Sequence, residues 1–178
     1  MAILAAMLTL SLLRHAKSSW SDLELDDHDR PLAKRGAKAI PLLAKYFRQE
    51  KLRPDLILCS DAMRTRATLA LLLAELGTPP ARIVYDGKLY LASPDTIRAA
   101  LARHGEAEPH VLVVGHNPGL HALALELVGH GDRKLLAGLA REFPTGALAV
   151  LSFNAPSWSE IALASGNLEH FTTPRRLA

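Results

Sequence analysis

The chain has 178 residues, of which 49% are apolar and 22% charged, a balance typical of one globular domain and unlike that of fibrous or disordered proteins. Its formal net charge is +3, and the basic residues are scattered along the sequence, which argues against nucleic acid as a partner. Because Cys59 is the single cysteine, a disulfide framework and paired-cysteine metal or redox motifs are excluded.

Residues 1–13 form an apolar segment at the start of the chain. The segment lacks the basic region of a signal peptide and is too short for a transmembrane helix, so we interpret residues 8–13 as a strand. Residues 1–6 are expected to be an extension that precedes a natural start near Met7. Since no targeting segment is recognised, we expect a cytoplasmic protein without a membrane partner.

Short runs of strand-forming apolar residues alternate with longer segments of helical periodicity. The predicted strands are residues 8–13, 55–59, 82–85, 110–114, 147–153 and 160–164. The predicted helices are residues 33–50, 61–76, 94–104 and 120–128. Pro41 is expected to kink or shorten the first helix. Ser60 and Ser93 are expected to cap the second and third helices, and Gly77 and Gly105 to end them.

The pattern of these elements predicts an α/β fold. Residues 56–58 and 111–114 are apolar on both faces, as in a parallel sheet that is covered by helices on both sides. The last two predicted strands are joined by a short link, which indicates an antiparallel hairpin at a sheet edge. We therefore predict one domain over residues 1–178, with three αβα layers, a mainly parallel central sheet and an antiparallel edge strand. Its core is expected to span about residues 8–165, with tails at 1–6 and 172–178.

Polar residues follow three of the predicted strands. Arg14 and His15 follow the first strand, Arg64 lies at the start of the helix after the second, and His116 follows the fourth. In open α/β sheets, ligands bind beyond the carboxyl ends of the strands. Two guanidiniums and a helix N-terminus suit a dianionic phosphoryl group. We therefore expect these residues to converge on one phosphoryl-transfer site.

The two histidines of this expected site suit different tasks. A neutral imidazole can attack phosphorus in line when its far nitrogen donates to a carbonyl, and His15, beside Arg14, best fits that role. His116 would face the same phosphoryl oxygens and, with Arg14 and Arg64, stabilise charge in the transition state. The remaining histidines show no ligand spacing, so no metal site is predicted.

Three motifs in this order carry a family resemblance. They are Leu13-Arg14-His15-Ala16-Lys17, the run from Ser60 to Thr68, and Val114-Gly115-His116-Asn117-Pro118. Together they resemble the histidine phosphatase superfamily, also called phosphoglycerate mutase-like. The short chain and the segments Lys17-Ser18-Ser19-Trp20 and Asp29-Arg30-Pro31-Leu32 are most similar to the SixA-type phosphohistidine phosphatases. The resemblance covers roughly residues 8–165.

The resemblance implies a phosphoglycerate mutase-like fold and a phosphatase that works without a metal or other cofactor. It implies His15 as the phosphorylated nucleophile, with Arg14, Arg64 and His116 as the other catalytic residues. Ser21 lies where larger relatives often carry an asparagine, so it becomes a candidate substrate-binding residue.

The general acid of the larger relatives has no obvious counterpart, because residues 89–93 contain no carboxylate. Asp22, Asp26, Asp27 and Asp95 remain candidate acids. The P–N bond of phosphohistidine is labile and needs less proton donation than a phosphate ester. A chain with few insertions also leaves an open pocket, so the expected substrate is a protein that bears phosphohistidine. The alternatives are a broad small-molecule phosphomonoesterase and a non-catalytic phosphate-recognition module.

Overall fold

The structure is a computed structural model that describes residues 6–77 and 82–178. The strands are β1 (Ala6–Arg14), β2 (Leu56–Cys59), β3 (Arg82–Tyr85), β4 (His110–Gly115), β5 (Val128–Gly131), β6 (Leu148–Ala155) and β7 (Gly166–Thr172). The α-helices are α1 (Lys34–Gln49), α2 (Met63–Leu76), α3 (Pro94–His104), α4 (Gly119–Leu127), α5 (Arg133–Arg141) and α6 (Pro174–Leu177). Short 3-10 helices are η1 (Asp27–Asp29), η2 (Gly87–Leu89) and η3 (Trp158–Glu160). Within the described ranges, no helix combines the length and apolar character needed to cross a membrane.

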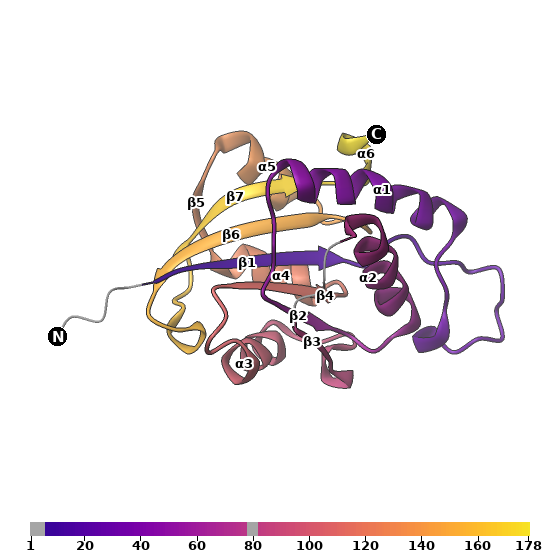
Figure 1. Ribbon diagram of the computed structural model, residues 1–178, viewed down its shortest axis with the longest axis horizontal. Coiled ribbons are helices and arrows are strands. Elements are labelled where there is room, and N and C mark those ends of the chain that lie inside the picture. Colours follow the sequence, from indigo (N-terminus) through magenta and orange to yellow (C-terminus); the bar gives the residue numbers. More distant parts are fainter. Residues whose placement is uncertain (1–5, 78–81) are drawn as a thin grey trace.

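A seven-stranded sheet with the order β3-β2-β4-β1-β6-β7-β5 forms the centre of the molecule (Figure 1). Its neighbouring strands are parallel except where β6 pairs with β1 and with β7. The predicted α/β class with a mainly parallel sheet is therefore confirmed. The antiparallel strand was predicted at an edge of the sheet. In the structure, the antiparallel strand β6 lies inside the sheet, and the edge next to β7 is formed by the parallel strand β5.

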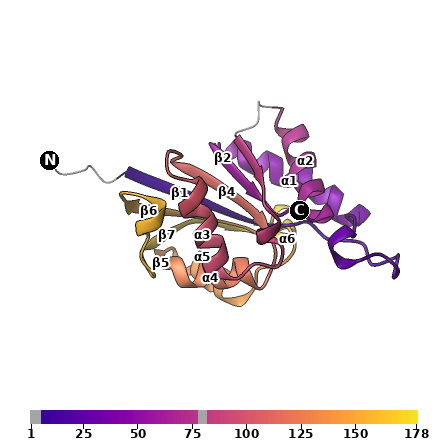
Figure 2. The same cartoon turned by 90° about the horizontal axis from the view of Figure 1, so that it is seen from below.

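Successive side chains of a strand point to opposite faces of the sheet, so each face forms a core with the helices that cover it. Leu10 and Leu12 of β1 pack in the core formed with α3, α4 and α5, whereas Leu13 packs in the core formed with α1 and α2. Figure 2 shows α1 and α2 on one side of the sheet and α3, α4 and α5 on the other. Strands β1 to β4 run in the same direction, so their carboxyl ends lie at one edge.

The end of the chain differs from its prediction. Residues 160–164 do not form a strand, and β6 pairs instead with β7, which begins at Gly166. The apolar run that suggested a strand is not one buried face, because Ile161 is buried while Leu163 is 59% exposed. The sheet thus continues beyond the predicted core limit at residue 165. The segment 172–178 is not a free tail, since Thr172 ends β7 and α6 contacts α1.

Other boundaries were predicted with mixed success. Residues 82–85 form β3 as predicted, and the Ser93 side chain caps α3, which ends before Gly105. The first helix is not shortened, because α1 runs through Pro41 to Gln49. Neither β5 nor α5 was predicted. The expected extension at residues 1–6 lies outside the described residues, except that β1 begins at residue 6.

Candidate active site

The residues predicted for the phosphoryl site come from elements that meet at one edge of the sheet. Arg14 ends β1 and His15 follows it, His116 follows β4, and Arg64 lies in the first turn of α2, which follows β2. Because β4 pairs with both β1 and β2, these three strand ends are neighbours. The imidazole rings of His15 and His116 have centroids 5.3 Å apart. The fold therefore brings together side chains that are far apart in the sequence.

His15 is held as a neutral imidazole with a defined tautomer. Its Nδ1 lies 2.8 Å from the carbonyl oxygen of Ala16, and because a carbonyl can only accept, Nδ1 carries the proton. The lone pair is therefore on Nε2, which has no hydrogen-bond partner among the described residues. Burial, reinforced by the charges of Arg64 and Arg14, lowers the pKa of His15 to about 4. The ring is thus uncharged at neutral pH and presents one nucleophilic nitrogen.

His116 is also buried and neutral. Its Nε2 lies 2.8 Å from the Ser60 hydroxyl, while its Nδ1 is buried without a partner among the described residues. Burial, followed by the neighbouring His15 and Arg64, lowers the pKa of His116 to about 3. The sequence predicted Ser60 as the N-cap of α2, but Ala62 occupies that position. The Ser60 hydroxyl instead orients His116.

Two guanidiniums lie close enough to influence each other. Arg64 is only 5% exposed, and burial together with the charge of Arg64 lowers the pKa of Arg14. Arg14 donates from Nη1 to the carbonyl of Phe143 at 3.1 Å, and its buried Nε has no partner within the described part of the chain. Two neighbouring guanidiniums, one of which has an unused buried donor, favour an anionic ligand.

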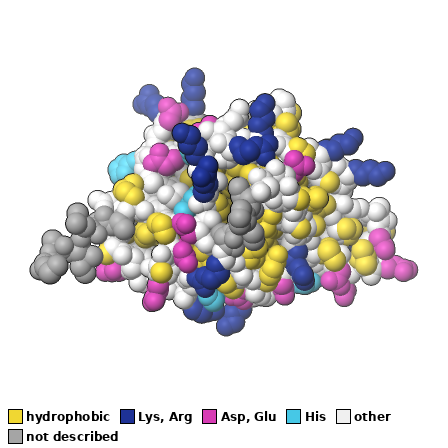
Figure 3. Space-filling view, in the orientation of Figure 1, with side chains coloured by type: hydrophobic (Ala, Val, Ile, Leu, Met, Phe, Trp, Pro, Cys, Tyr) yellow, Lys and Arg dark blue, Asp and Glu magenta, His cyan; other side chains and the backbone are white. Residues whose placement is uncertain are grey.

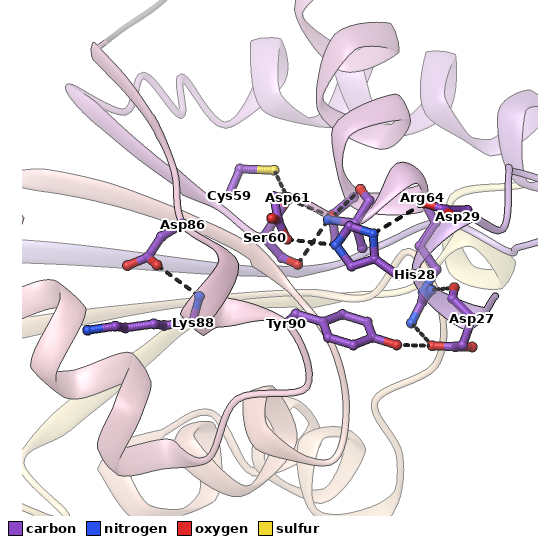
Figure 4. A network of polar contacts seen from close by, with 12 residues as sticks. Asp27, His28, Asp29, Cys59, Ser60, Asp61, Arg64, Asp86, Lys88 and Tyr90 are labelled. Carbon is purple, nitrogen blue, oxygen red and sulfur yellow. Dashed lines mark hydrogen bonds and ion pairs between the residues drawn. The ribbon is translucent and has the colours of Figure 1, made fainter.

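Asp27 and Tyr90 complete the surroundings of Arg64 (Figure 4). Asp27, on η1, accepts from Nη2 of Arg64 at 3.0 Å and from the Tyr90 hydroxyl at 2.5 Å. The Tyr90 ring stands at 90° to the ring of His116, with centroids 5.4 Å apart. The hydrogen bond from Tyr90, supported by Arg64, lowers the pKa of Asp27, whereas burial and then Asp27 raise the pKa of Tyr90. Asp27 is therefore ionised and Tyr90 protonated at neutral pH.

Sequence reasoning placed these two neighbours only in part. Asp27 is one of the four candidate acids predicted from the sequence, whereas Tyr90, in residues 89–93, was not predicted as a site residue. A signal was present for Tyr90, because it closely follows β3 at the edge where the other site residues gather. The contacts of Asp27 had no such signal, since it lies on a loop between β1 and α1.

The other proposed residues lie apart from this cluster. Ser21 is exposed, and the hydrogen bonds described for it join it to Ser19. Asp22, Asp26 and Asp95 are exposed as well, and none has a hydrogen bond to the two histidines or two arginines within the described residues. In the same part of the chain, no group of three His, Cys, Asp or Glu residues is arranged to hold a metal ion.

Comparison with known sequences shows which proteins this chain is similar to. The model of the histidine phosphatase superfamily (branch 1) matches residues 10–89. The uncharacterized protein Rv1276c of Mycobacterium tuberculosis is 37% identical over 165 residues, covering 92% of this chain and 100% of the relative. The uncharacterized chloroplastic protein At3g52155 of Arabidopsis thaliana is 33% identical, covering 88% of this chain and 72% of the relative.

Comparison with solved structures shows which proteins share the fold of this chain. A protein from Nakamurella multipartitia, provisionally named phosphohistidine phosphatase SixA, is 33% identical with a TM-score of 0.78, covering 96% of this chain and 98% of that one. A protein from Agrobacterium tumefaciens with the same provisional name is 31% identical with a TM-score of 0.77, covering 94% and 98%. The protein histidine phosphatase SixA complexed with tungstate shares the fold, with a TM-score of 0.74 at 21% identity, covering 96% and 100%.

Proposed function

This chain belongs to the histidine phosphatase superfamily, with SixA-type proteins among its relatives, and from that premise we propose that it hydrolyses phosphohistidine in proteins through a phosphorylated His15. One observation carries the proposal. His15 is a neutral imidazole whose Nδ1 is fixed by Ala16, whose Nε2 is unoccupied by any described residue, and whose neighbours are Arg14, Arg64 and His116.

The proposed reaction has two displacements at phosphorus. In the first, Nε2 of His15 forms a bond to phosphorus while the bond from phosphorus to the substrate imidazole breaks, and that imidazole leaves with a proton from solvent. In the second, a water oxygen forms a bond to phosphorus while the bond from phosphorus to Nε2 of His15 breaks, the water loses a proton to solvent, and inorganic phosphate leaves. Arg14, Arg64 and the unpartnered Nδ1 of His116 are the groups proposed to bind the phosphoryl oxygens during both displacements.

The state of Asp27 supports phosphohistidine over a phosphate ester as the substrate. An alkoxide leaving group needs a positioned proton donor, whereas an imidazole leaves readily once it is protonated. Of the four candidate acids, Asp27 contacts the cluster, and its pKa is lowered by Tyr90 and Arg64. An ionised carboxylate is a poor proton donor. We therefore assign Asp27 the role of positioning Arg64.

The test compares phosphate release from a phosphohistidine protein with release from glycerol 3-phosphate, an ester with an alkoxide leaving group, both in the presence of a chelator. The native chain is expected to act rapidly on phosphohistidine and weakly on the ester. His15→Ala is expected to reduce the rate at least about a thousand-fold. The matched control is His130→Ala, which removes an exposed histidine on β5 and is expected to retain the native rate.

Each other outcome points to a different protein. A preference for the ester would contradict the proposal and indicate a general phosphomonoesterase. Stable binding of the phosphorylated protein with no release of phosphate, in the native chain, would indicate a recognition module instead. Equal activity of the native chain and His15→Ala would remove His15 from the mechanism.

A further inference from the structure

A pocket of about 480 Å³ adjoins the candidate active site but contains none of its four predicted catalytic residues. Its walls come from residues 16–17, from α1, from residues 142–145 and from residues 173–178. Ala16 and Lys17 directly follow His15 in the chain. The opposite wall is tied to the same place, because the main-chain N–H of Gly146 donates to the carbonyl oxygens of Arg14 and His15 at 3.1 and 2.9 Å. We call this cavity the basic pocket.

The rim of the basic pocket is cationic and its floor is apolar. Four exposed cations line the rim: Lys17, Arg35, Lys38 and Arg175. Within residues 6–77 and 82–178, none of these four forms an ion pair. The acidic side chain in the lining is Glu142, whose carboxylate lies 3.6 Å from the Arg141 guanidinium. The lining also contains apolar residues, called the floor below, which include Ala16, Pro144 and Pro174.

The cationic surface extends beyond this pocket. A second hollow shares Glu142, Thr173 and Arg175 with the basic pocket and adds Arg141 and Arg176. Figure 3 shows Lys and Arg side chains over the upper part of the face that α1 crosses, with Asp and Glu side chains among them. Arg141 is paired with Glu142, and the other cations of the two hollows, which lack an acidic partner among the described residues, favour a ligand that supplies negative charges.

Close packing fixes the side of the basic pocket that is nearest to His15. A Cβ atom on Gly36 would lie 2.2 Å from the carbonyl oxygen of Lys17, so α1 approaches this main chain more closely than any other residue would permit. The same carbonyl accepts from the main-chain N–H of Ala33 at 2.8 Å. The backbone of Lys17 is therefore held in place while its side chain is exposed.

We propose that the basic pocket binds an acidic segment of the protein substrate while the phosphohistidine of that substrate occupies the neighbouring site. This inference rests on the proposed function. A bare phosphoryl group at His15 would leave the four rim cations unused. A pocket of about 480 Å³ with an apolar floor accommodates side chains of a polypeptide, and its rim matches carboxylates near the phosphorylated residue.

The test uses two phosphohistidine peptides of equal length, one with Asp and Glu around the phosphohistidine and one with Ser and Asn. The native chain is expected to have a kcat/KM about five-fold higher for the acidic peptide, a ratio that decreases as salt is added. In the variant Arg35→Ala/Lys38→Ala/Arg175→Ala, the ratio is expected to fall to about one. The variant Lys45→Ala/Arg53→Ala/Lys134→Ala removes the same charge at exposed positions outside the pocket and is expected to keep the native ratio.

A binding measurement separates failure of this inference from failure of the proposed function. An acidic peptide without a phosphoryl group carries a fluorophore, and its anisotropy is titrated with each of the three proteins. If no phosphohistidine peptide is hydrolysed, the proposed function fails, and the pocket is judged on this titration alone. Weaker binding by the pocket variant than by the control variant supports the basic pocket. Equal binding by both variants, or a native kcat/KM ratio near one, overturns it.

Discussion

His15 and His116 owe their uncharged state to burial and to nearby guanidiniums. The pKa of each ring is lowered from the ordinary value of 6.5, to about 4 for His15 and to about 3 for His116. A protonated ring at either position would sit among cations with little water, so the fold favours the form that can act as a nucleophile or accept a hydrogen bond. Because burial lowers these two pKa values, protonation of the site residues also changes the free energy of unfolding.

We predict that the free energy of unfolding decreases between pH 7 and pH 5. Below pH 6.5 the unfolded chain binds protons at these histidines while the native chain does not, so stability is lost as the pH falls toward the native pKa values. The expected loss at pH 5 is about 2 kcal/mol for each histidine. In His116→Gln, the difference in urea-unfolding free energy between the two pH values should shrink by about that amount.

The comparison of these two proteins isolates His116. Half-buried His28, whose pKa is raised mainly by Asp61, contributes in the opposite direction, but it is present in both proteins and cancels. Identical pH dependence in the native chain and in His116→Gln would contradict a buried neutral His116.

Asp27 offers a second prediction, because positioning and proton donation have different kinetic signatures. Asp27→Asn removes the ion pair with Arg64, so we expect the inhibition constant of inorganic phosphate to rise about ten-fold. Tyr90→Phe retains the ring and should change this constant less than about three-fold. If Asp27→Asn abolishes turnover of phosphohistidine and leaves the affinity for phosphate unchanged, Asp27 acts as a proton donor.

Contact between α1 and the segment after β1 gives a prediction about packing. In Gly36→Ala, the new methyl group would meet the Lys17 carbonyl at 2.2 Å, and main chain rather than a flexible side chain would have to move. We expect a loss of about 2 kcal/mol in unfolding free energy and a lower kcat/KM, because the moving segment carries His15. Lys45→Ala places the same residue at an exposed position of α1 and should change stability by less than about 0.5 kcal/mol. Native stability and activity in Gly36→Ala would show that this close approach is not required.

The elements predicted best from the sequence are those with a regular pattern of buried side chains or a local capping signal. The continuous apolar runs of β2 and β4 and the capped start of α3 were predicted because burial and capping act locally. By contrast, β5 contains Gly129, where a Cβ would lie 1.9 Å from the Ala164 carbonyl, so its glycine reflects a neighbour that no local pattern reveals. The strand β7 begins at Gly166 for a similar reason, since a Cβ there would lie 2.7 Å from the Phe153 ring.

The residues of the candidate site divide in the same way, into those placed by regular elements and those placed by tertiary contacts of loops. His15, Arg64 and His116 could be placed because they stand at or just after the ends of buried strands, where parallel topology determines position. Asp27 and Tyr90 reach the cluster from 3-10 turns and loops, whose course depends on tertiary contacts rather than on periodicity. Ser21 was placed by resemblance alone, and its position on an exposed loop does not join it to the cluster.

The two cores pack on opposite faces of one sheet, so a probe buried in either core reports on opening of the sheet. Cys59 is fully buried at the end of β2, in the core shared with α1 and α2, and precedes Ser60, which contacts His116. Burial raises the pKa of its thiol to about 12. Alkylation of the native protein should therefore require unfolding of the region around the sheet.

We predict that inorganic phosphate slows this alkylation by stabilising the folded state. For a ligand that binds only the native protein, the labelling rate should fall by the factor one plus the ratio of ligand concentration to Kd, or about eleven-fold at ten times Kd. Mass spectrometry after timed exposure to iodoacetamide measures the rate. Arg64→Ala should lose most of the protection, because phosphate would lack one of its two guanidiniums. Rapid alkylation that does not respond to phosphate would instead show that the end of β2 opens locally, without unfolding the site that it supports.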